Sequence, residues 1–344
     1  MSDEHDTEVM APPRFPRTTK LGVGDVKPLP DLINKTVLDR YLVEGELGKG
    51  AMGKVYRGRH IKLGREVAIK VLHYHLVNDK NMLGRFRREA QVAARLSHGN
   101  VISVLDVGET EGTHLIVFEL ARGSTLRRVM DAAPLPPARI IQLVGQILRG
   151  LDHAHGAGLI HRDLKPENII VEPAPDGAEV PRIVDFGVAA LRDPEESVEG
   201  GKLTASGVIV GTPLYMAPEQ AKGEEFDHRI DLFALGVVVY EMLAGVQPFQ
   251  GSAIEIALAN IGKDPPPITD RVRGIPAPDP LLELFARKLM ARRLADRFPS
   301  AHAALETLDL IERDRDHALL ALGQMDIAKA LAVVSLPDAP KKRR

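Results

Sequence analysis

A change of pattern near residue 123 constrains the fold more than any other feature of this sequence. Before it, short apolar runs end at glycines, and after it apolar residues recur at helical spacing over longer stretches. Runs of the first kind predict strands and stretches of the second kind predict helices. Strands are expected over residues 41–47, 53–59, 66–72, 101–106 and 114–118, with one helix over 81–96. Later helices are expected from Pro137 onward and over 231–244, 253–261 and 279–290, with strands at 169–172 and 182–184. The expected fold class is therefore α+β, with the sheet first and most helices after it.

Composition excludes several classes of protein. With 344 residues, 44% of them hydrophobic, the chain can bury a large core in one or two domains. A net charge of −2 gives no general attraction for nucleic acid, so no nucleic-acid partner is expected. The absence of cysteine excludes disulfides, a thiol nucleophile and a cysteine-bound zinc. The most apolar run, 232–244, contains Glu241 and is shorter than the ~20 residues that a membrane span needs, so we expect no span and a cytoplasmic location.

The two ends of the chain differ from its centre. Residues 1–38 mix proline, threonine and charge without periodicity, which predicts a disordered leader. Residues 307–344 are weakly helical and end in Lys-Lys-Arg-Arg, which predicts a helical or disordered tail with a solvated basic end. One domain is expected between them, over residues 39–306.

A glycine-rich segment lies between the first two expected strands of this domain. Residues 48–55 read Gly-Lys-Gly-Ala-Met-Gly-Lys-Val. Glycine suits backbone that presses against phosphates or adopts a positive φ. A P-loop is excluded, because that motif needs Ser or Thr after its lysine and then a helix, whereas Val55 and a strand follow here. A glycine hairpin without a ligand stays open as the alternative.

Lys70 lies in the apolar run 66–72, where an unpaired ammonium group is costly. Phosphate oxygens, together with Glu89 on the expected helix 81–96, would supply the missing negative charge. Alternatively, Lys70 and Glu89 are unrelated surface residues.

The strongest chemical signal is the segment 161–168, which reads His-Arg-Asp-Leu-Lys-Pro-Glu-Asn. Asp163 can accept a proton from an attacking hydroxyl group. Lys165 can hold a phosphate, and Asn168 offers an oxygen to a hard cation such as Mg²⁺. Asp185, in an Asp-Phe-Gly segment after an expected hairpin, adds a carboxylate for the same cation.

In this order the motifs resemble those of the eukaryotic-type protein kinases, and more closely their bacterial serine/threonine members. The resemblance covers about residues 41–304 and includes Ala217-Pro218-Glu219 after the motifs above. It implies the two-lobed protein-kinase fold, with an N-lobe at 39–121 and a C-lobe at 122–306. It also implies transfer of the ATP γ-phosphoryl group to serine or threonine hydroxyls of proteins, with Mg²⁺ or Mn²⁺ as the metal.

The resemblance also assigns roles to single residues. Asp163, Lys165, Lys70 and Glu89 would be catalytic, with Lys70 paired to Glu89, and Asn168 and Asp185 would bind the metal. The residues expected at ATP are Leu47, Gly48, Lys49, Gly50, Ala51, Met52, Gly53, Lys54, Val55, Ala68, Lys70, Phe118, Glu119, Ala121 and Ile170. Among them, Val55 and Ala68 would cover the adenine, Ile170 would lie beneath it, and Phe118 would be the gatekeeper. Backbone groups of Glu119 and Ala121 would bond the adenine edge.

Two structural features follow from the same resemblance. Asp231 would brace the catalytic loop through the backbone N–H groups of His161 and Arg162. Glu219 and Arg297 would form a buried ion pair.

The resemblance bears on substrate and regulation as well. Lys165 and Thr212 are typical of kinases that act on serine and threonine. Thr204 and Ser206 occupy positions where related bacterial kinases carry a phosphorylated pair, so autophosphorylation opposite Arg162 is expected, with self-association for reaction in trans. Alternatively, these are ordinary loop hydroxyls.

Two other classes of function were weighed against this one. A pseudokinase, in which the fold serves only as a binding or scaffolding module, predicts loss of Lys70, Asp163, Asn168 or Asp185, and all four are present. A kinase of small molecules does not account for Lys165 or for the segment 211–220.

Overall fold

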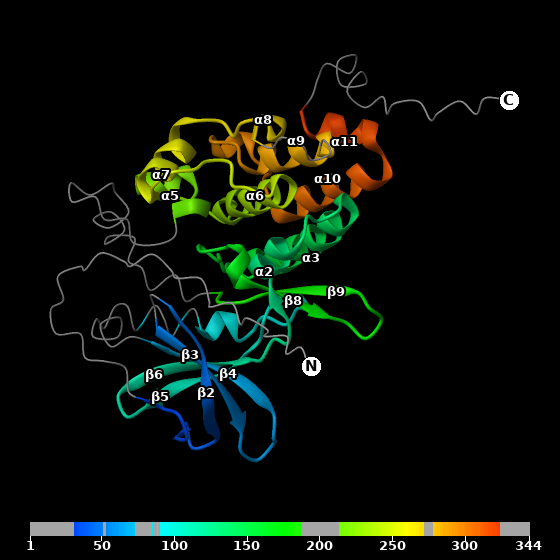
Figure 1. Cartoon of the computed structure of the whole chain (residues 1–344). Coiled ribbons are helices and arrows are strands. Elements are labelled where there is room, and N and C mark those ends of the chain that lie inside the picture. Colours follow the sequence, from blue (N-terminus) through cyan, green and yellow to red (C-terminus); the bar gives the residue numbers. More distant parts are fainter. Residues whose placement is uncertain are drawn as a thin grey trace, which may run out of the picture.

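The computed structural model describes residues 31–50, 53–72, 84, 88, 90–186, 213–271 and 278–323. These residues form a small lobe made mainly of strands and a larger lobe made mainly of helices (Figure 1). The α+β class and the two-lobed arrangement expected from the sequence are both present.

The small lobe is built on one six-stranded antiparallel sheet with the order β1-β2-β3-β4-β6-β5. Its strands are β1 (Thr36–Val37), β2 (Tyr41–Gly50), β3 (Gly53–His60), β4 (Glu66–Leu72), β5 (Val104–Thr110) and β6 (Thr113–Glu119). In β4, Val67, Ile69 and Val71 are fully buried on one face. Because side chains alternate across a strand, Lys70 is turned to the other face.

The large lobe contains the remaining described elements, among them a second sheet of three short strands in the order β7-β8-β9. They are β7 (Ser124–Thr125), α2 (Leu126–Ala132), α3 (Pro137–Gly156), η2 (Pro166–Asn168), β8 (Ile169–Pro173), β9 (Glu179–Ile183), η4 (Pro213–Tyr215), α5 (Pro218–Lys222), α6 (Arg229–Ala244), α7 (Ala253–Gly262), α8 (Ile268–Arg271), α9 (Pro280–Leu289), η5 (Leu294–Asp296), α10 (Ala301–Arg313) and α11 (Arg315–Ala321).

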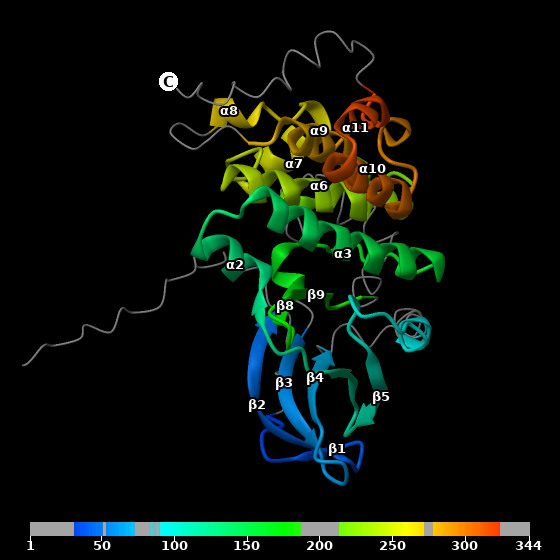
Figure 2. The same ribbon diagram turned by 90° about the vertical axis from the view of Figure 1, so that its right-hand side faces the viewer.

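Helix α6 is the centre of the large lobe. Nearly all of its residues are buried, as expected of a helix that is apolar on every side. Gly245 ends it with φ of 68°, in the left-handed region where glycine is favoured. Helix α3 lies across the large lobe, with β8 and β9 between it and the small lobe (Figure 2).

Most element boundaries match the expected ones, and the exceptions have local causes. The run expected as a strand from residue 101 begins at Val104 instead, because Val101 and Ile102 pair with Ile183, the last residue of β9. Strand β9 begins at Glu179, earlier than expected, because it pairs along the whole of β8. Within the expected helix 81–96, the described residues 84, 88 and 90–93 are helical.

Buried residues continue past both expected ends of the domain. Leu32 and Val37 are buried in the core of the small lobe. Helix α10 continues through residue 306, and α11 buries Ala318 and Leu319 beyond it. Apolar spacing alone was too weak to reveal these short additions. Within the described residues, no helix is long and apolar enough to cross a membrane.

Candidate active site

The segment 161–168 forms a loop between α3 and β8, and a buried carboxylate from α6 holds it. Asp231 accepts hydrogen bonds from the backbone N–H groups of His161 (2.8 Å) and Arg162 (2.9 Å), as expected. Burial alone would raise the pKa of Asp231, but the bond from His155 (2.8 Å) and the neighbouring histidines hold this pKa below its usual value. Asp231 therefore remains an anion that fixes the loop.

His161 ties this loop to the strand that precedes Asp185. Its Nδ1 accepts a bond from the backbone N–H of Asp163 (3.2 Å), and its Nε2 donates to the Val184 carbonyl (2.8 Å). This pattern requires a neutral ring with the proton on Nε2. The ring of Phe186 packs edge-on against it, with centroids 4.8 Å apart. No role for the His161 side chain was expected from the sequence.

Two strained backbone positions lie at the same place. Arg162 and Asp185 are not glycines, yet each has φ of 67°. A side chain in this left-handed region costs on the order of 1–3 kcal/mol, and surrounding bonds must enforce it. Here those bonds are the Asp231 brace and the His161–Val184 contact.

Five side chains expected at the reaction centre converge between the lobes. Lys165 Nζ lies 2.7 Å from Asp163 Oδ2, and Asn168 Nδ2 donates to the Asp163 carbonyl (2.8 Å). The Asn168 carbonyl accepts from the backbone N–H of Val184 (2.9 Å), which brings Asp185 beside it. Lys70, nearly buried in β4, closes the set with Nζ 2.9 Å from Asp185 Oδ2. Segments far apart in the sequence therefore meet at one site.

The donor set fits a divalent cation and phosphate. Because Asn168 uses its amide N–H, its Oδ1 remains as a neutral oxygen ligand. The Asp185 carboxylate follows Val184, whose backbone is bonded to Asn168, and hard cations prefer oxygens of both kinds. The described residues contain no group of three or more His, Asp or Glu that would hold a metal by themselves. A bound ion would thus need phosphate or water oxygens as further ligands, as Mg²⁺ commonly does.

Two glycines of the segment 48–55 differ in what surrounds them. A Cβ placed on Gly53 would lie 1.8 Å from the Val71 carbonyl, so packing of β3 on β4 requires glycine there. A Cβ on Gly48 would meet no atom within 4 Å. Packing within the described protein therefore gives no reason for glycine at position 48, and close approach of a phosphate would give one.

The residues expected around adenine lie on β4, β6 and β8. Ala68 pairs with Phe118 across β4 and β6, and Phe118 is buried. The backbone N–H of Glu119 donates to the Ser103 carbonyl (3.0 Å), so an adenine would have to use the Glu119 carbonyl. Ile170 lies in β8. Of the other expected contacts, Leu47, Gly48, Lys49 and Gly50 end β2, Gly53, Lys54 and Val55 begin β3, and Ala121 follows β6.

Six of the expected residues lie outside the described residues: Ala51, Met52, Glu89, Thr204, Ser206 and Thr212. The pairing of Lys70 with Glu89 is among these expectations.

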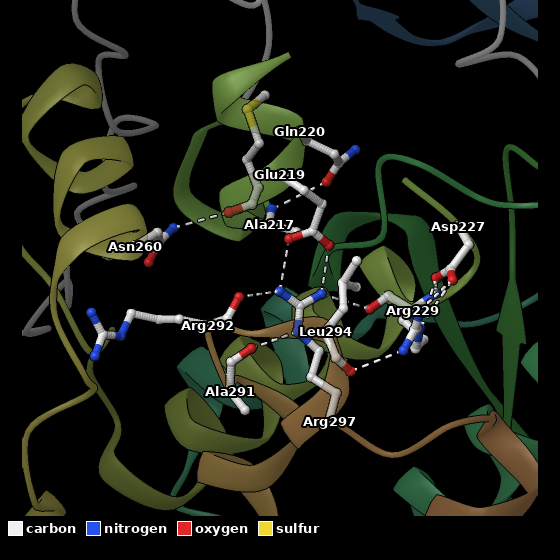
Figure 3. Close-up of polar contacts among 11 residues, drawn as sticks. Ala217, Glu219, Gln220, Asp227, Arg229, Asn260, Ala291, Arg292, Leu294 and Arg297 are labelled. Carbon is white, nitrogen blue, oxygen red and sulfur yellow. Dashed lines mark hydrogen bonds and ion pairs between the residues drawn. The ribbon is translucent and has the colours of Figure 1, made fainter. Parts of the chain in front are cut away.

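The expected ion pair of the large lobe, between Glu219 and Arg297, is present. Arg297 donates to both oxygens of Glu219, at 2.6 and 2.8 Å, and neither side chain is more than 5% exposed (Figure 3). Arg297 also donates to the carbonyls of Ala291 and Arg292 (Figure 3). The pair anchors α5, and Gln220 on that helix donates to the Arg162 carbonyl at 3.4 Å.

A second polar cluster was not anticipated from the sequence. Arg127 on α2 donates to both oxygens of Glu241 (2.9 and 3.1 Å), to the Tyr215 hydroxyl (2.6 Å) and to Glu167 (3.2 Å). Burial raises the pKa of Tyr215, which keeps its hydroxyl protonated as a donor to Glu241. A glutamate inside the apolar run 232–244 was the one local signal for this cluster.

Comparison with known proteins gives consistent matches. The protein kinase domain model matches residues 41–306. Serine/threonine-protein kinase pkn3 of Myxococcus xanthus is 41% identical over 288 residues, which cover 83% of this chain and 52% of that protein. PknL of Mycobacterium tuberculosis is 37% identical over 288 residues, covering 83% of this chain and 69% of PknL. This chain thus spans about half the length of the first relative and somewhat more of the second.

Solved structures match as well. The crystal structure of the Mycobacterium tuberculosis PknI kinase domain superposes with a TM-score of 0.62 at 28% identity. The superposition covers 81% of this chain and 98% of that domain.

Proposed function

Because this chain belongs to the protein kinase domain family, in its bacterial serine/threonine branch, we propose that it transfers the γ-phosphoryl group of ATP to serine and threonine hydroxyls of proteins. One observation carries this proposal: Lys70, Asp163, Asn168 and Asp185 are linked into one group by short polar contacts and a backbone bond. A module that only binds partners has no need for this arrangement.

The role of each residue follows from its chemistry and position. Asp163, held by Lys165 and by the fixed loop, orients the attacking hydroxyl and accepts its proton. Lys165 also lies where it can reach the transferred phosphate. Lys70 binds the α- and β-phosphates and, in this proposal, pairs with Glu89 when ATP is bound. Asn168 and Asp185 hold Mg²⁺ or Mn²⁺, which would neutralise charge on the phosphate oxygens.

Adenine is proposed to lie between Val55 and Ala68 on one side and Ile170 on the other, with its edge toward the Glu119 carbonyl and Ala121. Gly48 and its neighbours in the glycine segment would cover the phosphates. Lys165, together with Thr212, favours a short hydroxyl as the acceptor. The expected substrates are therefore proteins with an accessible serine or threonine hydroxyl.

We further propose activation by autophosphorylation at Thr204 and Ser206, in trans between two copies of the chain. Each phosphate would bring about −1.5 to −2 charges toward the cation of Arg162, next to Asp163. Replacement of both residues with alanine should lower activity, and undiminished activity would remove this part of the proposal. A cytoplasmic location is proposed because ATP is an intracellular substrate.

The decisive experiment is incubation of the purified chain with γ-labelled ATP, Mg²⁺ and a general protein substrate. Wild type should incorporate label on serine and threonine. Asp163→Asn and Lys70→Met should abolish incorporation, and both should melt at a temperature close to that of wild type. Label incorporated at the wild-type rate by folded Asp163→Asn protein would refute the assignment. A folded wild type that binds ATP without transferring phosphate under activating conditions would instead favour a pseudokinase.

A further inference from the structure

The β8–β9 hairpin carries an arginine that contacts the segment where adenine is proposed to bind. Arg182, in β9, donates from Nη2 to the Glu119 carboxylate at 2.8 Å and to the Val101 carbonyl at 3.3 Å. From Nη1 it donates to Glu172 on β8 at 3.4 Å. Its side chain is 16% exposed. One guanidinium group thus joins β9, β8, the end of β6 and the segment before β5.

The backbone around Arg182 is fixed from both sides. Ile183 donates to the Asn100 carbonyl (2.8 Å), and the Ile183 carbonyl accepts from Ile102 (2.9 Å). On the other side, Glu179 forms a two-bond pair with Arg139 of α3, at 2.7 and 2.8 Å. Strand β9 is therefore a rigid support, and Arg182 lies in it one residue before its end.

Two parts of the proposed ATP site depend on this support. Arg182 is the direct cross-strand partner of Ile170, so their side chains share one face of the hairpin. Three residues beyond Arg182 the same strand leads to Asp185, and Val184 bonds both Asn168 and His161 on the way. Strand β9, which leads to the proposed metal ligand Asp185, is thus also linked through Arg182 to Glu119, whose carbonyl would meet adenine.

We infer that Arg182 is a positioning residue for the nucleotide, acting through the Glu119 carboxylate to hold the Glu119 backbone where an adenine edge can bond to it. This inference rests on the proposed function. Glu119 has a second partner, Arg65, but that contact is longer (3.5 Å) and the Arg65 side chain is 52% exposed. Exposed pairs of this kind contribute little. Arg182 and Arg65 therefore form a matched pair with the same partner and opposite burial.

The test compares Arg182→Met, Arg182→Lys and Arg65→Met with wild type. The readouts are KM for ATP, KM for the protein substrate, kcat, and the Kd for adenosine from calorimetry. Arg182→Met should raise KM for ATP and Kd for adenosine about tenfold, from loss of a hydrogen bond to a charged group. Its KM for the protein substrate should stay within about twofold of wild type. Arg182→Lys should recover part of the loss, because it keeps the charge without the fork. Arg65→Met should stay within about twofold in every readout.

Three results would overturn the inference: an unchanged Kd for adenosine in folded Arg182→Met, an equal loss in Arg65→Met, or a fall in kcat with no change for ATP or adenosine. If Arg182→Met does not fold, Glu119→Met removes the same contact from its other side, because its side chain offers no oxygen to Arg182, and should weaken adenosine binding similarly. The adenosine measurement needs no phosphoryl transfer. A wild type that binds adenosine but transfers no phosphate would contradict the proposed function and still test Arg182.

Discussion

Replacing Arg297 with methionine should destabilise the large lobe strongly. The substitution keeps an unbranched apolar side chain of similar length but removes both bonds to Glu219. The Glu219 carboxylate would then remain in a site where it is 5% exposed, without its cation. Breaking one partner of a buried pair in this way costs about 3–5 kcal/mol.

The surroundings of Arg297 place the expected cost in the upper half of this range. Its guanidinium group also bonds the carbonyls of Ala291 and Arg229 and lies 5.0 Å from the centre of the Phe233 ring. Methionine can replace the packing on Phe233 but none of the hydrogen bonds, and each lost bond to a charged group removes further stabilisation. Replacing Glu219 with leucine as well should cost less than the sum of the two single changes, since no buried charge is then left unpaired.

Urea unfolding followed by far-ultraviolet circular dichroism measures this free energy. Arg292→Met is the matched control, because Arg292 neighbours the same cluster but forms an exposed pair with Asp264. It should cost under about 1 kcal/mol. A loss below about 1 kcal/mol in Arg297→Met, or an equal loss in the control, would refute the argument from burial.

Three further outcomes are expected. A chain ending at residue 306 should melt well below the full chain, because it lacks Leu308, Ile311 and Leu319, which are buried. Each of them contributes about 1.5–3 kcal/mol, and equal melting temperatures would contradict this. Burial raises the pKa of Asp279, but its pairing with Arg315 lowers this pKa below the usual value. Asp279 therefore stabilises the fold above about pH 4 and loses this effect as the pH falls through the lowered pKa. In Asp279→Asn the urea midpoint should vary less with pH between about pH 5 and 3, and the same pH dependence as in wild type would contradict the pairing. Gly48→Ala should keep the wild-type melting temperature but raise KM for ATP, whereas Gly53→Ala should lower the melting temperature. A lower melting temperature in Gly48→Ala and an unchanged one in Gly53→Ala would refute the distinction between the two glycines.

The parts of the site that could be predicted from the sequence are those in which the chemistry is local. Asp163, Lys165 and Asn168 lie within six residues of one another, so any loop that forms there brings them together. The Asp231 brace and the Glu219–Arg297 pair span long stretches of sequence and were reachable only through the family resemblance. Spacing alone contains no information about which distant carboxylate meets a given cation.

The parts that could not be predicted depend on register and on tertiary packing. Arg127 and Arg182 read as ordinary charged residues, because a charged side chain beside apolar ones in a helix or strand is usually on the solvated face. Their burial arises only when α2 meets α6 and when β9 pairs with β8 in one register. A shift of β9 by one residue would turn Arg182 to the opposite face and away from Glu119. The structural role of such residues is fixed by the pairing of the strands, not by their local sequence.

This dependence on register explains why strain collects at Asp185. The ladder to β8 and the bonds to Asn100 and Ile102 fix β9 up to Ile183, and His161 and Asn168 hold Val184 immediately after it. The chain must then turn within one residue to direct a carboxylate toward Lys70, and Asp185 adopts φ of 67° to do so. Glycine at this position would relieve the strain but remove the carboxylate. The unfavourable backbone conformation is therefore the cost of delivering a charged group from a rigid strand, and the bonds of β9 and His161 supply the stabilisation that offsets it.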